Sequence, residues 1–203
     1  MERRKARTRE SLIDAASELL ARPTQSEVSV QQITDLADVG VGSFYNYFDN
    51  KEQLYDAAIL ASLENYGILF DSVTQGIADP AERFAAGVRM TVRLRSTHSQ
   101  MTLILMNRGL RYMNTSVGLA PRALRDLEAA ESAGRLNFPS LRYALACTTG
   151  SILGVLQLHE DDRTEELTAL SDQLAFSLLR MFGMDKRQAE RLSRKELRPP
   201  VAH

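Results

Sequence analysis

The sequence predicts an all-α fold with two helical domains, and three observations support this prediction. Apolar residues recur with a period near 3.6 along most of the 203-residue chain, as in amphipathic helices. Strand signals are weak throughout, because β-branched residues are scattered and do not alternate with polar ones. Residues that begin or end helices stand between the apolar segments, such as Asp79-Pro80, Gly134 and Gly183.

The N-terminal part is expected to contain a helix from Arg7 to about Ala21, with Leu12, Ala16, Leu19 and Leu20 on one face. A short helix is predicted from Ser29 to Ala37, because Ser29 can cap it and Gln32 follows three residues later, as in a capping box. Its apolar stripe consists of Val30, Ile33, Leu36 and Ala37. Residues 38–41 then form a tight turn that contains glycine.

The helix expected after this turn is rich in Tyr, Asn and Ser, which suits contact with polar base edges and phosphates. Phe44 and Phe48 are expected in the core because they are four residues apart, whereas Tyr45 and Tyr47 fall on other faces. The alternative, that all these aromatic residues are core, does not explain the two tyrosines. Another helix starts at Lys51, capped by Asp49 or Asn50. Two short helices joined by a turn with glycine form a helix-turn-helix.

Charge is distributed unevenly, although the formal net charge is only −1. Residues 1–9 contain five basic side chains and one acidic one, whereas residues 10–60 contain two basic and nine acidic side chains. We therefore expect an N-terminal arm in which Arg3, Arg4 and Lys5 contact phosphates or the minor groove. The alternative is a disordered tail that only increases solubility.

The second domain is expected to begin with a connecting helix from Asp56 to about Ser72. Further helices are predicted from Asp79-Pro80 to about Arg95, from Ser99 to Arg108, from Pro121 to Ala133, from Ser140 to His159 and from Thr164 to Phe182, with a charged helical tail. In the helix after Ser140, one stripe contains Cys147, Gly150 and Gly154, which would let another helix approach closely. The last long helix carries Leu170 and Leu174. A helix with two apolar faces needs two packing partners. We expect one partner to be the rest of its own subunit and the other to be a second copy of the chain, which predicts a homodimer. The alternative is that both faces are buried within one subunit.

Several other classes of protein lack support in the sequence. The three histidines stand far apart without metal-ligand spacing, and no phosphate-binding glycine loop or nucleophile elbow occurs. No apolar run is long enough for a membrane span, and no signal peptide is evident. The single cysteine, Cys147, fits a reducing cytoplasm. We therefore expect neither an enzyme nor a cofactor. Asp126, Glu128 and Glu131 are expected on a solvated helix face.

Residues 1 to about 60 resemble the DNA-binding head of the TetR family of bacterial repressors. The residues that carry the resemblance are Ile33, Leu36 and Ala37, the run Gly42-Ser43-Phe44-Tyr45, Tyr47-Phe48, and Lys51-Glu52-Gln53-Leu54. Two positions depart from the family pattern: Asp38 stands where glycine is usual, and Val41 where a polar residue or lysine is frequent. Aspartate tolerates turn conformations, so Asp38 is compatible with the fold, whereas Val41 bears on base preference.

The resemblance implies DNA contacts at Val30, Gln31, Val41, Gly42, Ser43, Tyr45, Tyr47 and Lys51. The side chains of Gln31 and Ser43 can read base edges, and Val41 can touch a thymine methyl group. The tyrosines and Lys51 suit phosphates, which position a protein on DNA without specifying sequence.

The resemblance further implies a helix-turn-helix domain over residues 1–55 and a helical effector-binding and dimerisation domain over residues 56–203. The expected effector pocket involves Met90, Met101, Leu105, Arg108 and Tyr112, in a segment rich in soft apolar residues. The same residues could equally form an ordinary core, and Arg93, Arg95 or Arg111 could anchor an acidic ligand. The function implied is a cytoplasmic, dimeric regulator that binds a palindromic operator and a small-molecule effector. The alternative is a helical ligand carrier or partner-binding adaptor without DNA binding.

Overall fold

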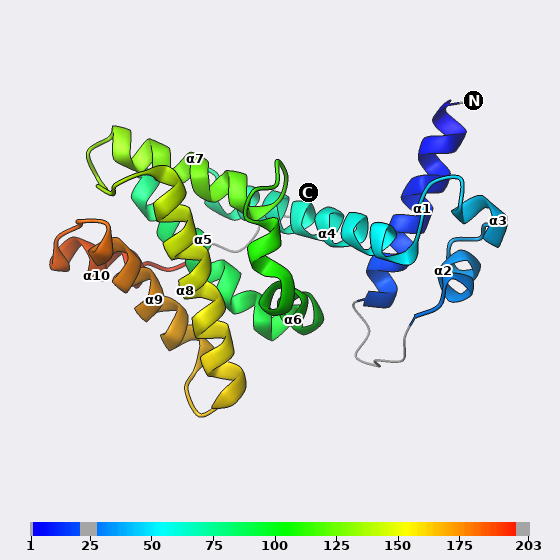
Figure 1. Ribbon diagram of the computed structural model, residues 1–203. Helices are drawn as coiled ribbons and strands as arrows, with labels where there is room; N and C mark the ends of the chain where they lie inside the picture. The colour runs from blue at the N-terminus through cyan, green and yellow to red at the C-terminus, as the bar shows by residue number, and fades with distance from the viewer. Residues whose placement is uncertain (1, 21–27, 198–203) are drawn as a thin grey trace. The chain divides into compact units, whose positions relative to one another are not determined.

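The structure is a computed structural model that describes residues 2–20 and 28–197, and its regular elements are helices, as predicted (Figure 1). The chain divides into two compact units, unit 1 (Met1–Asn65) and unit 2 (Tyr66–His203). The helices are α1 (Glu2–Leu20), α2 (Val30–Leu36), α3 (Val41–Phe44), α4 (Lys51–Thr74), α5 (Pro80–Thr97), α6 (Ser99–Arg108), a 3₁₀ helix η1 (Gly109–Tyr112), α7 (Leu119–Ser132), α8 (Leu141–Asp161), α9 (Leu167–Met181) and α10 (Lys186–Ser193).

Unit 1 is built around a small apolar core to which α1, α2, α3 and the first part of α4 all contribute. Its buried residues include Leu12 of α1, Ile33 of α2, Phe44 of α3 and Leu54 of α4. The Ser17 hydroxyl also donates a hydrogen bond to a backbone carbonyl of α4. The packing of α2 and α3 against α1 and α4, with a turn between α2 and α3, confirms the predicted helix-turn-helix.

Helix α1 differs from the prediction at its beginning. It starts at Glu2 rather than near Arg7, so the basic residues expected in an arm belong to the helix itself. Arginine and lysine are good helix formers, and a run of them continues a helix as readily as it ends one.

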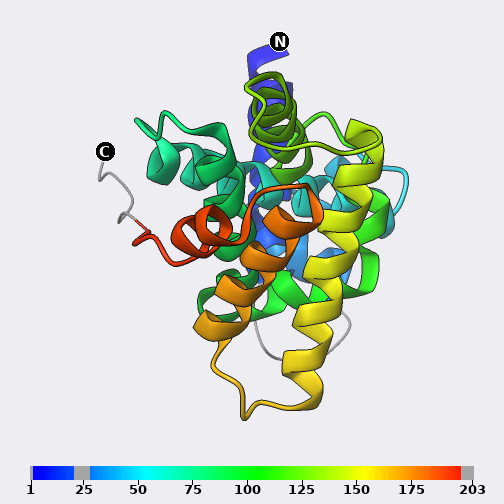
Figure 2. The ribbon, with the colours of Figure 1, turned by 90° about the vertical axis from the view of Figure 1, so that its left-hand side faces the viewer.

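Unit 2 is organised around α5, which contacts α7, α8, α9 and α10. Figure 2 shows α8 and α9 side by side, joined by a loop at their lower ends in that view. The core includes Phe84 and Val92 of α5, and Phe182, which follows α9, lies edge-on to Phe138 with 5.4 Å between ring centroids. The core is thus shared by helices that are distant in sequence.

Residue types that favour a helix start predicted one helix correctly and another incorrectly. Asp79 caps α5 by accepting a hydrogen bond from the Ala81 amide at 3.0 Å, as predicted from Asp-Pro. The predicted start of the last long helix at Thr164, as its cap, is wrong, because α9 begins at Leu167 after Glu166. The Thr164 amide instead donates to Asp162 in the loop before the helix.

Helix α4 runs without interruption through the position where the sequence analysis placed a domain boundary, residues 55 and 56. The two compact units divide ten residues later, between Asn65 and Tyr66. One continuous helix of 24 residues therefore contributes to both units.

Candidate functional site

Local hydrogen bonds fix the start of α2 and the turn that leads from α2 into α3. The Ser29 hydroxyl accepts from the Gln32 amide at 3.2 Å, and the Gln32 side chain accepts from the Ser29 amide at 2.8 Å, which completes the predicted capping box. After α2, Asp38 adopts a left-handed conformation with φ of 53°, and the Val39 amide donates to the Thr34 carbonyl. This tight reversal leads directly into α3.

Helix α3 has only one α-helical turn, but the chain stays coiled beyond it. The amides of Tyr47 and Phe48 both donate to the Phe44 carbonyl, at 2.9 and 3.1 Å. Phe44 and Phe48 are buried, with ring centroids 5.9 Å apart, which confirms their predicted place in the core. Two aromatic anchors therefore hold a short segment in which Tyr45 and Asn46 are exposed.

The predicted DNA contacts of this region differ in their exposure. Tyr45 is 62% exposed and lies edge-on against Phe44, with 5.0 Å between their ring centroids. Gln31 is exposed, but its amide nitrogen donates to the Asp35 carboxylate at 2.6 Å, so a bond to a base must share or replace that contact. The Lys51 ammonium lies 5.6 Å from the centre of the Tyr55 ring.

The remaining predicted contacts are distributed over the same elements. Val30, Val41, Ser43 and Tyr47 are half-buried, and Gly42 is exposed with open space where a side chain would point. Lys5 is exposed on α1. Arg3 and Arg4 lie in α1, but their side chains are outside the described residues.

The expected effector residues are only partly described. Leu105 and Tyr112 are buried and Met90 is half-buried, while the side chains of Met101 and Arg108 lie outside the described part of the chain. Burial of this kind suits both a closed pocket and a packed core.

Two of the arginines considered as ligand anchors have carboxylate partners inside unit 2. Arg93 of α5 contacts Asp172 of α9 at 2.6 Å, and Arg95 of α5 contacts Glu160 of α8. The hydrogen bond from Arg95, supported by Arg163, lowers the pKa of Glu160 to about 2. These ion pairs fasten α5 to its neighbours, so the two guanidinium groups already have anionic partners.

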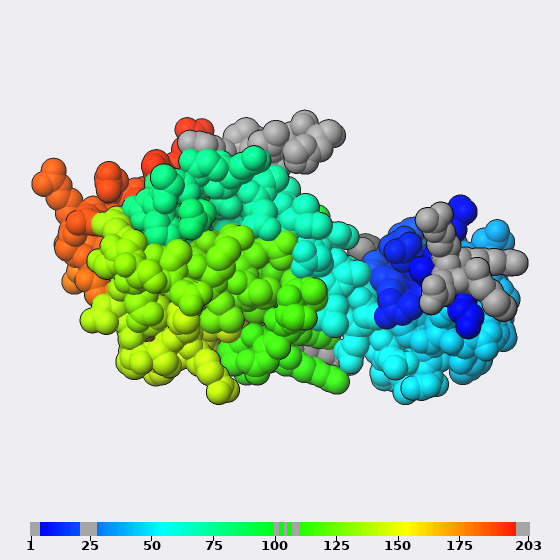
Figure 3. Space-filling view, turned by 90° about the horizontal axis from the view of Figure 1, so that it is seen from above, coloured from blue at the N-terminus to red at the C-terminus, as the bar shows by residue number. Residues whose placement is uncertain are grey.

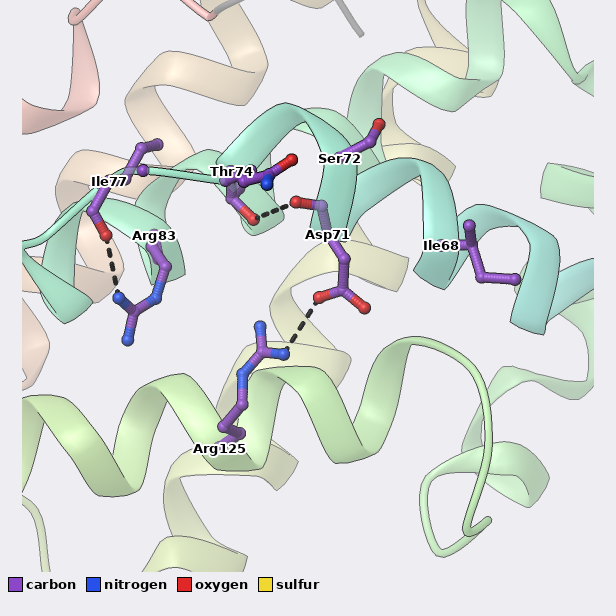
Figure 4. A pocket seen from close by; sticks show the side chains of 9 residues that line it. Ile68, Asp71, Ser72, Thr74, Ile77, Arg83 and Arg125 are labelled. Atoms are coloured by element: carbon purple, nitrogen blue, oxygen red, sulfur yellow. Dashed lines mark hydrogen bonds and ion pairs between the residues drawn. The ribbon is translucent and has the colours of Figure 1, made fainter. Parts of the chain in front are cut away.

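A pocket of about 630 Å³ lies elsewhere in unit 2, between the end of α4, the start of α5 and α7 (Figure 4). Its lining residues are Ile68, Asp71, Ser72, Thr74, Gln75, Gly76, Ile77, Arg83 and Arg125. None of the described residues expected at the effector site belongs to this lining. Figure 3 shows this face of unit 2, where the end of α4 and the start of α5 adjoin α7.

Two arginines of the pocket lining are bonded to a buried carboxylate, Asp126. Asp126 was expected on a solvated face, but its side chain is 0% exposed and accepts hydrogen bonds from Arg83 and Arg125, both at 3.1 Å. Arg125 also contacts Asp71 of α4 at 3.0 Å. A buried carboxylate needs such partners, and no local pattern could indicate an arginine 43 residues away in the chain.

The surface formed by α8 and α9 is apolar enough to be an interface. Tyr143, Leu158 and Met181 are exposed large hydrophobic residues, and Gly150 and Gly154 face open space. Cys147 is half-buried. Leu170 and Leu174, expected at the dimer interface, are instead buried inside unit 2, at 8% and 7% exposure. Because both side chains are buried within the subunit, they would contribute little to an interface on this surface.

The described residues also bear on metal binding and on membrane insertion. No group of three or more His, Cys, Asp or Glu side chains is arranged to hold a metal ion in the described part of the chain. Among the described helices, none combines the length and apolarity that a membrane crossing requires.

Comparisons with known proteins agree with the helix-turn-helix and the helical second unit. Residues 12–58 match the family model "Bacterial regulatory proteins, tetR family", and residues 79–195 match "Tetracyclin repressor-like, C-terminal domain". No curated protein sequence matches the chain.

Solved structures extend the similarity over nearly the whole chain. The structure of RolR in complex with resorcinol is 30% identical, with a TM-score of 0.75 over 97% of this chain and 98% of that one. RolR without ligand is also 30% identical, with a TM-score of 0.72 over 92% and 96%. FadR from Bacillus subtilis in complex with stearoyl-CoA is 19% identical, with a TM-score of 0.58 over 85% and 96%, and shares the fold.

Proposed function

The chain belongs to the TetR family of DNA-binding transcription regulators, and from this premise we propose that it is a repressor. As a homodimer it binds an approximately palindromic operator, and a small-molecule effector releases it. The observation that carries this proposal is the short α3 segment, anchored by Phe44 and Phe48, which presents Tyr45 and its polar neighbours outward.

Base readout in this proposal falls to the residues that can approach base edges. Gln31 and Ser43 offer hydrogen-bonding groups, and Val41 offers a methyl surface for thymine. Tyr45, Tyr47 and Lys51 contact phosphates, with Arg3, Arg4 and Lys5 of α1 as additional basic contacts. Because Gln31 already bonds to Asp35, its pairing with a base is an exchange of partners.

The proposed effector is apolar or amphipathic and binds in the region of Met90, Met101, Leu105, Arg108 and Tyr112. Support comes from the burial of Leu105 and Tyr112 and from the small aromatic ligand, resorcinol, in a relative 30% identical to this chain. An effector shifts the protein away from DNA only if it binds the non-DNA conformation more tightly. By linkage, the operator must then weaken effector binding by the same factor.

Fluorescence anisotropy with DNA that flanks the gene tests operator binding. A tight, competitor-resistant complex is expected, and Lys51→Ala should weaken binding to all sequences about equally and reduce the salt dependence by about one unit of slope. Lys186→Ala, which removes an exposed lysine of α10, is the matched control and should change neither quantity. Binding no tighter than that of unrelated DNA would argue against the repressor proposal.

A further inference from the structure

The pocket between α4, α5 and α7 combines features of a small-molecule site. It is an open groove of about 630 Å³, so a bound ligand would keep one side in solvent. Two guanidinium groups, of Arg83 and Arg125, line it together with the apolar side chains of Ile68 and Ile77. Ile68 is 56% exposed, so its side chain is accessible to an apolar ligand.

Hydrogen bonds to neighbouring groups of the protein hold the guanidinium groups of Arg83 and Arg125 in place. Both donate to the fully buried carboxylate of Asp126, and Arg83 also donates to the Ile77 carbonyl at 2.9 Å. Within the described residues, the second terminal nitrogen of Arg83 has no hydrogen-bond acceptor. Part of the donor capacity of this fixed guanidinium is therefore unused.

Arg125 has a second bond that can be exchanged at little cost. Its contact with Asp71 joins side chains that are 49% and 40% exposed, and exposed ion pairs contribute only about 0–1 kcal/mol. Asp71 would not be left unpaired, because Arg122 of α7 contacts it at 2.7 Å. Arg122 lies directly over Gly67, where the absence of a Cβ atom makes room for it.

We propose that this pocket binds an amphipathic carboxylate, separately from the effector region described above. The ligand carboxylate takes the place of Asp71 on Arg125 and accepts from the free nitrogen of Arg83, and its apolar body covers Ile68 and Ile77. An anion suits this site, because two guanidinium groups, of Arg83 and Arg125, share the buried carboxylate of Asp126. Figure 4 shows Arg125 extending from α7 toward Asp71 on α4.

Calorimetric titration with cinnamate and with its neutral isostere cinnamamide tests this site on the full-length protein. Cinnamate should bind at least about tenfold more tightly than cinnamamide, because charge-assisted hydrogen bonds are the stronger ones. Arg125→Gln should lower cinnamate affinity by about tenfold and leave cinnamamide unchanged. Ile68→Asn, an exposed position whose replacement leaves the ion pairs intact, should weaken both ligands.

Arg194→Gln, on an exposed arginine outside the pocket, is the matched control and should bind both ligands as the unaltered protein does. Thermal unfolding of each variant establishes that it is folded. Absence of cinnamate binding, or equal affinity in the unaltered protein and both pocket variants, would overturn the proposal. The titration contains no DNA, so its outcome is independent of operator binding, and either proposal can fail alone.

Discussion

Asp38 occupies a backbone conformation that costs free energy for any residue with a Cβ atom. Its φ of 53° is the only positive value among the described residues other than glycine. A left-handed conformation costs an L-residue about 1–2 kcal/mol, somewhat less for Asp and Asn. The turn nevertheless forms, because the Val39 amide reaches the Thr34 carbonyl and the flanking helices share one core.

At this position glycine should be more stabilising than alanine. We expect Asp38→Ala to be about 1 kcal/mol less stable to urea than Asp38→Gly, since only glycine adopts this φ without strain. Asp14→Ala, which removes an exposed aspartate from the interior of α1, is the control and should not destabilise, because alanine is the better helix former. Equal stability of the two Asp38 variants would contradict the proposed strain.

Single residues were predictable where their partners are close in sequence. The capping box of Ser29 and Gln32 and the pairing of Phe44 with Phe48 depend on spacings of three and four, which the sequence displays directly. Asp126 was not predictable, because burial depends on how α5 packs against α7. Leu170 and Leu174 could not be assigned to the core or to a partner for the same reason.

Ion pairs between helices make the stability of unit 2 depend on pH in the acid range. The hydrogen bond from Arg95 of α5 lowers the pKa of Glu160 of α8 from 4.5 to about 2. A folded-state pKa below the unfolded one gives stabilisation that is complete above pH 4.5 and is lost as the pH falls toward 2.

Glu160→Gln should remove this pH dependence. The difference in free energy of unfolding between the unaltered protein and the variant is expected to be largest near about pH 6 and to shrink by about pH 2.5. Chemical denaturation at both pH values measures it. Glu165→Gln, at an exposed neighbour, is the control and should show a smaller change. A difference that stays constant with pH would show that the Arg95 contact does not act through ionisation.

Most helices could be placed from periodicity and from residues such as Asp79 and Gly183, but their ends were less certain. The start of α1 was predicted too late, at Arg7 instead of Glu2, because no residue type in this basic segment marks where the helix begins. Thr164 was a suitable cap by type, yet the loop bond from its amide to Asp162 delays the helix until Leu167. Competition between a cap and a local turn is decided by geometry that composition does not contain.

Assembly is the prediction that belongs to the whole molecule. The proposed dimer joins α8 and α9 of two subunits through the exposed surface of Tyr143, Gly150, Gly154, Leu158 and Met181. Glycine in a helix interior costs about 1 kcal/mol relative to alanine, which close helix packing would offset.

Replacing both Gly150 and Gly154 by leucine should prevent dimer formation without unfolding the subunit. A Cβ atom added at either glycine meets nothing within 4 Å in the single chain, and leucine is the better helix former, so the subunit should remain folded. The dimer should dissociate, because leucine prevents close approach, and light scattering would report the mass of a monomer. Glu128→Leu, on the exposed face of α7, is the control and should leave the mass unchanged. An undiminished dimer would place the interface on another surface.

Because α4 is one continuous helix, the number of residues in it sets the angle about its axis at which later residues lie. A helix advances about 100° and 1.5 Å per residue, so one residue inserted near Asn65 rotates the rest of α4 about the helix axis by more than a quarter-turn. Inserting seven residues nearly restores the original phase and lengthens the helix by about 10 Å. Anyone who grafts the helix-turn-helix of this chain onto another sensor should therefore match the helical phase at the junction as well as its sequence.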